Sequence, residues 1–204
     1  WEEKVGDKVV FAAVDCTGHG VPGAFMSLVG HNGLNQAVKE RGNTRPSDVL
    51  HDLDRMSYEA LHKDRDQFMR DGMDMALCAL DPKRMVLEYA GANCPLYLMR
   101  GDDIQQYAPD KRPIGGADPG DKRFTDHRIE LRKGDLIYIF SDGYADQFGG
   151  PNGKKFLQRR FRELLISIRH ETMERQKALL LEALNKWRGA QEQVDDILVM
   201  GMRA

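Results

Sequence analysis

The stretch from Val9 to Met26 most constrains what this chain can fold into, because it predicts a strand, a glycine turn and a helix in immediate succession. Residues Val9 to Val14 are apolar and partly β-branched, and the run is too short for a helix. Asp15 follows, and the turn CTGHG contains two glycines that permit unusual backbone angles. Pro22 presets a helical φ, so a helix is predicted from there. The stretch therefore predicts a carboxylate at the end of a rigid strand, facing a turn without bulky side chains.

Asp15 has two interpretations on this evidence. Its carboxylate and a carbonyl oxygen of the turn suit a hard divalent cation such as Mg²⁺ or Mn²⁺. An aspartate at the end of a strand is also a common turn former, and the segment by itself favours that role. Two later stretches repeat the arrangement, because the apolar run from Asp135 to Ser141 leads into Asp142, and Asp195-Asp196 precede the apolar run from Ile197 to Met202. Three acidic sites at predicted strand ends could converge at one edge of a sheet.

These stretches and their neighbours resemble the SpoIIE-type serine/threonine phosphatases, a bacterial branch of the metal-dependent protein phosphatase 2C class. The matching strings are DCTGHGVPGAFMS, DGMDMALCALD, EYAGANCPLYLMR, GDLIYIFSDGYADQ and VDDILVMGMR, so the resemblance covers nearly the whole chain. It implies two stacked antiparallel β-sheets flanked by helices on both outer faces. Periodicity alone indicates only an α+β fold, with helices near residues 22–39, 46–62, 156–169 and 171–187.

Short apolar runs separated by tight turns lie between the two predicted helix pairs, and they indicate antiparallel strands. Phe124 to Leu131 and Asp135 to Phe140 are predicted to pair with each other across the turn at residues 132–134. Asp74 lies inside the predicted strand from Met73 to Leu80. Two interpretations of Asp74 remain open, an outward-facing position and a place at the edge of the metal site.

The resemblance implies roles for individual residues. The aspartate matching Asp15 bridges two ions, and the backbone carbonyl at Cys16 completes the shell of one of them. Asp142 and Asp195 match ligands of the second ion, so Asp15 and Asp142 are the expected catalytic residues.

Two further residues, Asp196 and His19, are candidates for roles that support these ligands. Asp196 is either a substitute ligand or such a supporting residue. His19 could act as a general acid for the leaving alkoxide. Its spacing from Asp15 is longer than in the wider phosphatase class, so a turn-stabilising role is favoured.

Hydrolysis of a phosphomonoester is hard because the anionic oxygens repel a nucleophile, and two adjacent ions of Mg²⁺ or Mn²⁺ counter this repulsion. The resemblance implies a metal-dependent protein serine/threonine phosphatase that acts on a small partner of the anti-sigma-factor-antagonist type, under an upstream sensor domain. The alternative is a catalytically silent module that keeps the fold and only binds its partner. Asp15, Asp142 and Asp195 together speak against that alternative.

Composition excludes several other classes. A net charge of −2 over 204 residues gives no electrostatic case for nucleic acid. No apolar run approaches the ~20 residues that span a bilayer, and no signal-peptide pattern is present. Cys16, Cys78 and Cys94 lack the spacing of a zinc site or a disulfide framework. Cys94 and Arg100 match the spacing of cysteine-dependent phosphatases, but the bulky residues between them do not suit a phosphate cradle.

The expected organisation is one phosphatase domain over residues 1–204, either free in the cytoplasm or as the cytoplasmic part of a membrane-anchored sensor. The chain opens at Trp1 without an initiator methionine, which predicts a fragment of a longer signalling protein. The resembled family carries a further metal-binding aspartate just upstream of the strand that ends at Asp15. Glu2, Glu3 and Asp7 lie past that place, so weak binding of one metal is expected of residues 1–204.

Overall fold

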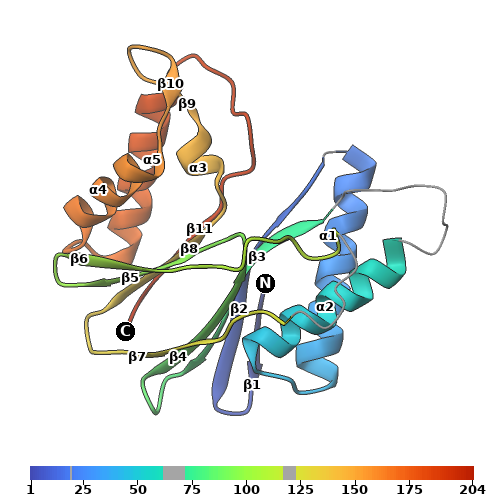
Figure 1. Cartoon of the computed structure of the whole chain (residues 1–204). Coiled ribbons are helices and arrows are strands. Elements are labelled where there is room, and N and C mark those ends of the chain that lie inside the picture. The colour runs from blue at the N-terminus through green and yellow to red at the C-terminus, as the bar shows by residue number, and fades with distance from the viewer. Residues whose placement is uncertain (19, 62–71, 117–122) are drawn as a thin grey trace. The chain divides into compact units, whose positions relative to one another are not determined.

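The computed structural model describes residues 1–18, 20–61, 72–116 and 123–204. These residues form two compact units, each with its own sheet, helices and apolar core (Figure 1). The N-terminal unit consists of Trp1–Leu96 and Tyr107–Arg132, and the C-terminal unit of Tyr97–Gln106 and Lys133–Ala204. The assignment of the whole chain to one phosphatase domain stays a prediction.

The sheet of the N-terminal unit has the strand order β1-β2-β3-β4-β7, and all its neighbouring strands are antiparallel. Its strands are β1 (Glu2–Val5), β2 (Lys8–Cys16), β3 (Met73–Asp81), β4 (Val86–Ala92) and β7 (His127–Glu130). The strand predicted to end at Val14 is longer than expected. Its ladder with β3 continues through Asp15 and Cys16, so both residues belong to the strand and not to the turn.

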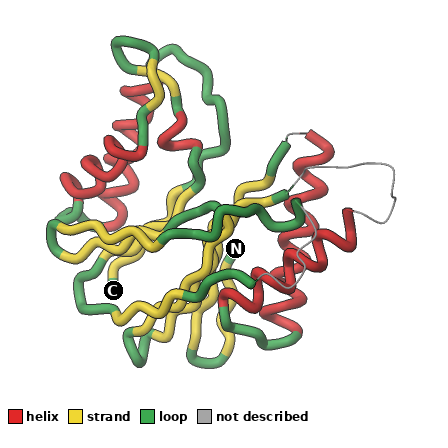
Figure 2. The backbone as a smooth tube through the Cα atoms, viewed as in Figure 1, coloured by secondary structure: helices red, strands yellow, loops and turns green. Residues whose placement is uncertain are grey.

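Three helical segments cover one face of this sheet, namely α1 (Gly20–Leu34), the π-helix η1 (Asn35–Glu40) and α2 (Pro46–Leu61) (Figure 2). The single helix predicted over residues 22–39 was wrong in detail. It begins at Gly20, and its end widens to a π-helix in which the Arg41 N–H donates to the Gln36 carbonyl, five residues back. The predicted glycine stop is confirmed, because Gly42 has a φ of 69° and its N–H bonds to the Val38 carbonyl.

The sheet of the C-terminal unit has the order β11-β8-β5-β6, and two longer helices pack against it. Its elements are β5 (Leu96–Arg100), β6 (Asp103–Tyr107), β8 (Leu136–Phe140), α3 (Gly143–Asp146), β9 (Phe148–Gly149), β10 (Lys154–Lys155), α4 (Gln158–Ile168), α5 (Met173–Arg188) and β11 (Val199–Arg203). Phe161 packs against Phe140 and Tyr144 in its core, edge-to-face with the first and tilted against the second, with ring centroids 5.0 and 4.8 Å apart. The short helix α3 and the β9–β10 hairpin were not predicted beyond a glycine-rich turn.

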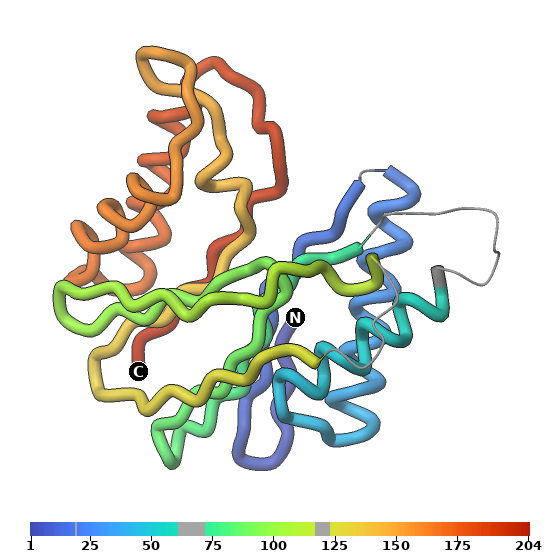
Figure 3. Tube along the Cα trace, in the orientation of Figure 1, coloured from blue at the N-terminus to red at the C-terminus, as the bar shows by residue number. Residues whose placement is uncertain are grey.

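The predicted pairing of the strands on either side of residues 132–134 was wrong. β7 pairs with β4, whereas β8 pairs with β11 (Figure 3). The hydrogen bonds of the connecting residues explain the difference. The Leu131 N–H donates to the Met85 carbonyl beside β4, while the Gly134 N–H donates to Ala204 and the Ala204 N–H donates to Asp135. The chain therefore leaves one sheet and enters the other at this turn.

The predicted α+β class, with antiparallel sheets and flanking helices, is confirmed. The four main helices lie within two residues of their predicted ends, with the exception of the π-helical extension. Within the described ranges, no helix has the length and apolar character needed to cross a membrane.

Candidate metal centre

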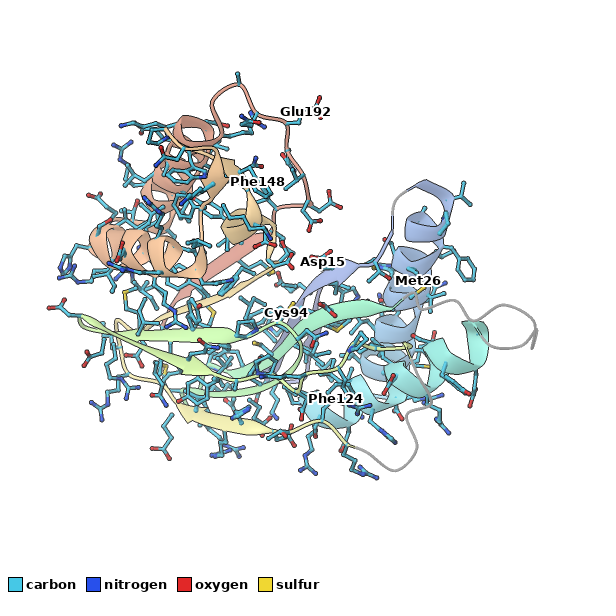
Figure 4. All side chains as sticks on the ribbon, turned by 45° about the horizontal axis from the view of Figure 1, so that its top comes forward. Asp15, Met26, Cys94, Phe124, Phe148 and Glu192 are labelled. Atoms are coloured by element: carbon cyan, nitrogen blue, oxygen red, sulfur yellow. The ribbon has the colours of Figure 1, made fainter. Side chains whose placement is uncertain are left out.

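Asp15 is the second-last residue of β2, and its partner in the antiparallel ladder is Asp74 of β3. Figure 4 shows Asp15 near the end of its strand. Residues directly opposite each other in such a pair point to the same face, with Cβ atoms about 4.5–5.5 Å apart. Both side chains are half-buried. Asp74 therefore shares the sheet face of Asp15 and lies beside it.

The carboxylate of Asp74 is held by Asn93, which follows β4. The Asn93 side-chain amide donates to Asp74 Oδ1 over 2.8 Å. Burial raises the pKa of Asp74, and the hydrogen bond from Asn93 offsets part of that rise. Asn93 has a φ of 58°, in the left-handed region that few residues other than glycine adopt. Its backbone N–H bonds to the Asp110 carbonyl over 2.9 Å, which fixes this conformation.

The turn after β2 is tied to the residue before β3 by three hydrogen bonds. The Thr17 hydroxyl donates to the Gly72 carbonyl (2.9 Å) and accepts from the Gly72 N–H (2.7 Å), and the Thr17 N–H donates to the same carbonyl (3.0 Å). Gly18 has a φ of 88°, as the predicted glycine turn requires. His19, the candidate acid, lies outside the described residues.

Cys16 presents its carbonyl, not its thiolate, as the donor that suits a hard ion. Burial raises the pKa of the Cys16 thiol, a hydrogen bond with Ser27 lowers it, and the negative charge of Asp15 raises it further. The net shift is upward, so the thiol stays protonated near neutral pH. A protonated thiol is a poor ligand, whereas carbonyl and carboxylate oxygens are the ligands that Mg²⁺ and Mn²⁺ prefer.

An ion pair between Asp54 of α2 and Arg112 supports the end of β3 that carries Asp74. Asp54 is 1% exposed, and its carboxylate accepts from Arg112 over 2.7 Å and from the Gly115 N–H over 2.8 Å. The neighbouring Ile114 exchanges two backbone hydrogen bonds with Met73, at 2.9 and 3.0 Å. The residue before Asp74 is thus fixed through residues 112–115 to the second helix.

In the C-terminal unit, Asp142 follows β8 and is exposed at the start of α3. Ser141 beside it is buried and clamps the segment that carries the other acidic pair. Its hydroxyl donates to the Asp196 carbonyl (2.9 Å) and accepts from the Leu198 N–H (3.0 Å), and its own N–H donates to the Leu198 carbonyl (3.0 Å). A Cβ atom on Gly143 would lie 2.3 Å from the Asp196 carbonyl oxygen, so only glycine allows this close approach. The structure therefore brings Asp142 next to Asp195-Asp196.

Asp195 and Asp196 are exposed and lie before β11, which begins at Val199 and not at the predicted Ile197. The Asp196 N–H donates to Asp195 Oδ1 over 2.8 Å. Further back, the fully buried Gln147 uses its side-chain amide to bond the carbonyls of Phe148 (3.0 Å) and Glu192 (2.9 Å), both labelled in Figure 4. Gln147 thereby fixes the start of the loop that leads to Asp195.

The predicted residues thus form two sets, one in each unit. Asp15 and Cys16 lie with Asp74 in the N-terminal unit, and Asp142 lies with Asp195 and Asp196 in the C-terminal unit. Within neither unit do the described residues bring three or more His, Cys, Asp or Glu side chains into a metal-holding group. Sequence reasoning missed Ser141 and Gln147, although the position of Ser141 directly before Asp142 was a signal that could have identified it. No sequence signal marks Gln147.

A family model described as Stage II sporulation protein E (SpoIIE) matches residues 5–204. The chain belongs to the SpoIIE family. Among curated proteins, none matches it in sequence. The SpoIIE membership confirms the resemblance on which the expected roles of the acidic residues rest.

Solved structures agree with this assignment. The SiaA-PP2C domain of Pseudomonas aeruginosa is 28% identical with a TM-score of 0.89, and the match covers 100% of this chain and 79% of that one. The PP2C phosphatase domain of SpoIIE from Bacillus subtilis, solved with a fragment of its regulatory domain, is 18% identical with a TM-score of 0.75, and the match covers 100% of this chain and 57% of that one. RsbX, solved in complex with magnesium, is 14% identical with a TM-score of 0.62, covering 100% and 85%. The protein phosphatase 2C-like fold is therefore confirmed.

Proposed function

We propose that this SpoIIE-family chain is a metal-dependent protein serine/threonine phosphatase domain that hydrolyses phosphoserine or phosphothreonine on a small signalling protein. The observation that carries the proposal is the clamp of Ser141 and Gly143 on Asp196, which holds two acidic segments together in the C-terminal unit. A chain that only bound a partner would have no need to hold two exposed acidic segments next to each other, because like charges repel.

Asp15, Asp142, Asp195 and the Cys16 carbonyl would hold two ions of Mg²⁺ or Mn²⁺. The chemistry of the donors fits such ions, since all four are oxygen ligands and the Cys16 thiol stays protonated. The magnesium complex of the structural neighbour RsbX supports the same choice. When bound, the two ions lower the pKa of a water and neutralise charge on the phosphoryl group.

The contribution of the protein is to hold its oxygen donors in fixed positions. β2 and β3 hold the Asp15 carboxylate through their ladder, and Thr17 locks the following turn to Gly72. Ser141 sets the distance between the residues around Asp142 and the backbone at Asp196. Donors fixed on rigid elements hold metal geometry better than donors on free loops. Asp196, whose carbonyl is engaged by Ser141, is a supporting residue in this proposal, and Asp195 is the ligand.

The substrate in this proposal is a phosphorylated domain of the anti-sigma-factor-antagonist type, and activity is controlled by a sensor domain upstream in the full protein. The similarity to the SiaA and SpoIIE phosphatase domains supports a signalling role of this kind. We place the domain in the cytoplasm, where such regulators of transcription act.

Turnover measurements test the proposal. The purified chain is assayed with 4-nitrophenyl phosphate and with a phosphoserine-bearing domain of the antagonist type, in Mn²⁺, in Mg²⁺ and in excess EDTA. We expect hydrolysis that requires the metal and that disappears in the Asp195→Asn variant. The alternative, a silent binding module, predicts tight binding of the phosphorylated domain with no release of phosphate under any of these conditions.

A further inference from the structure

We propose that Asp74 is an additional metal ligand, whose carboxylate contacts the ion held by Asp15. This inference rests on the proposed function and extends it, because the family resemblance gives no metal role to this position. The register of β2 against β3 places the two aspartates directly opposite each other.

The pairing itself calls for a cation. Like charges directly opposite on one face of an antiparallel pair destabilise the sheet, and half-burial strengthens the repulsion because less water screens it. A divalent ion between the two carboxylates converts this repulsion into attraction. Oxygen donors from two adjacent strands are also a suitable pair of ligands for Mg²⁺ or Mn²⁺.

Asn93 prepares the Asp74 carboxylate for this role. Its amide donates to Oδ1 over 2.8 Å, which fixes the rotation of the carboxylate while Oδ2 is the oxygen that we assign to the ion. Ligating carboxylates are commonly oriented in this way by a neighbouring hydrogen-bond donor. Asn93 holds this position in a left-handed conformation that costs free energy for a residue other than glycine.

The end of β3 is rigid enough to present a ligand. Met73, next to Asp74, is the ladder partner of Cys16 on one side, and its backbone N–H and carbonyl both bond to Ile114 on the other. Asp54 anchors Gly115 behind it. A ligand pair mounted on two bonded strands keeps its spacing when no ion is present, so binding requires little rearrangement.

The decisive variant is Asp74→Asn, because it removes the charge and preserves both the shape and the oxygen that accepts from Asn93. The matched control is Asp81→Asn at the opposite end of β3, where the carboxylate accepts from the Arg84 N–H (3.0 Å) and an asparagine oxygen can still do so. Asp15→Asn is the reference for loss of the ion. Mn²⁺ affinity is measured by titration calorimetry, and melting temperature is measured in EDTA and in saturating Mn²⁺.

We expect Asp74→Asn to lower Mn²⁺ affinity at least about ten-fold and to raise the melting temperature in EDTA, since the repulsion from Asp15 is gone. The control should keep its Mn²⁺ affinity within about two-fold, which is the usual scatter of such comparisons. Affinity within two-fold of the parent in Asp74→Asn, with the affinity lost in Asp15→Asn, would overturn this inference and leave the proposed function standing. Full affinity in both variants would overturn the N-terminal metal assignment as well.

A second variant keeps the proposal falsifiable if Asp74→Asn does not fold. Asn93→Gly removes the amide and suits the left-handed backbone better than asparagine does. We expect it to fold and to lower Mn²⁺ affinity several-fold, because the Asp74 carboxylate loses its orientation. Unchanged Mn²⁺ affinity in Asn93→Gly would count against Asp74 as a ligand.

Discussion

The two units hold their acidic residues in different ways. In the N-terminal unit, Asp15 and Asp74 lie inside a continuous strand ladder, and their positions follow from many backbone hydrogen bonds. In the C-terminal unit, Asp142 and Asp195 lie outside the strands, and a few contacts made by Ser141 and Gly143 hold them. The ladder distributes its support over many bonds, whereas the clamp concentrates it in two residues. Single substitutions near the clamp should therefore have larger effects than equivalent substitutions near the ladder.

The largest expected effect is the loss of a ligand from the C-terminal unit. Asp142→Asn should reduce turnover at least about a thousand-fold, or about 4 kcal/mol of transition-state stabilisation, because a metal ligand is lost. The fold should remain intact, since Asp142 is exposed and removing one charge from an acidic cluster relieves repulsion. Asp103→Asn, at an exposed position of β6, is the control. Turnover at saturating Mn²⁺ within a few-fold of the parent would remove Asp142 from the site.

The next effect concerns the ion pair behind the N-terminal ladder. Asp54→Asn should lower the free energy of unfolding by about 3 kcal/mol, because it takes one partner from a buried charge pair. Urea unfolding measures this loss. We expect Mn²⁺ affinity to fall as well, since Arg112 would lose its charge partner and the segment that bonds to Met73 through Ile114 would be held less firmly. A destabilised variant with unchanged Mn²⁺ affinity would show that Asp54 supports the core only.

A paired comparison of two hydroxyl groups sharpens the contrast. Ser141→Ala should cost about 2 kcal/mol, because the partly buried Leu198 N–H loses its acceptor and the Asp196 carbonyl loses a donor. Thr17→Val should cost only about 1 kcal/mol, because the Gly72 N–H loses its acceptor but the Gly72 carbonyl keeps its bond from the Thr17 N–H. Chemical denaturation of both variants gives the comparison. A larger loss in Thr17→Val would contradict the account of a concentrated clamp and a distributed ladder.

The sequence predicted most of the helices and the strand–turn–helix around Asp15, because these elements follow from local periodicity and from glycine and proline positions. The pairing of β7 and β8 was mispredicted because adjacency in sequence favours a hairpin, whereas hydrogen bonds to residues as distant as Ala204 decide the real partners. Local sequence patterns do not indicate which of several strands distant in sequence will pair.

The candidate site was predictable to a similar extent. The acidic positions were identified by their motifs, and the family resemblance supplied their expected roles. The pairing of Asp15 with Asp74 could not be predicted from the sequence. Helical segments separate β2 from β3 along the chain, and the packing of the whole unit sets the register of the two strands. The role of Gln147 was hidden for the same reason, since its partner Glu192 lies beyond α4 and α5.

The smallest expected effect is on the pH dependence of stability in the N-terminal unit. Burial acts to raise the pKa of Asp126, but hydrogen bonds from the Ser47 hydroxyl and N–H and from Arg45 outweigh it and hold the pKa below its ordinary value. The ionised carboxylate therefore stabilises the fold above the unfolded-state pKa of about 3.9. This contribution is lost as the pH falls through the lower folded-state pKa.

Urea unfolding of the parent and of Asp126→Asn, in steps from about pH 5 to about pH 3, checks this sign. The parent should lose stability more steeply than the variant as the pH falls. Equal slopes would mean that the carboxylate contributes nothing through its charge, and that its contacts with the start of α2 stabilise the helix only as neutral hydrogen bonds.

The central claim is that acidic residues of each unit are metal ligands on which hydrolysis depends, and Mn²⁺ titration of ligand variants tests it most directly. Mn²⁺ affinity is measured by calorimetry for the parent, Asp15→Asn, Asp195→Asn and the double variant. The account predicts an affinity loss of at least about ten-fold in each single variant and a larger loss in the double variant. Mn²⁺ affinity within about two-fold of the parent in either single variant would contradict the account.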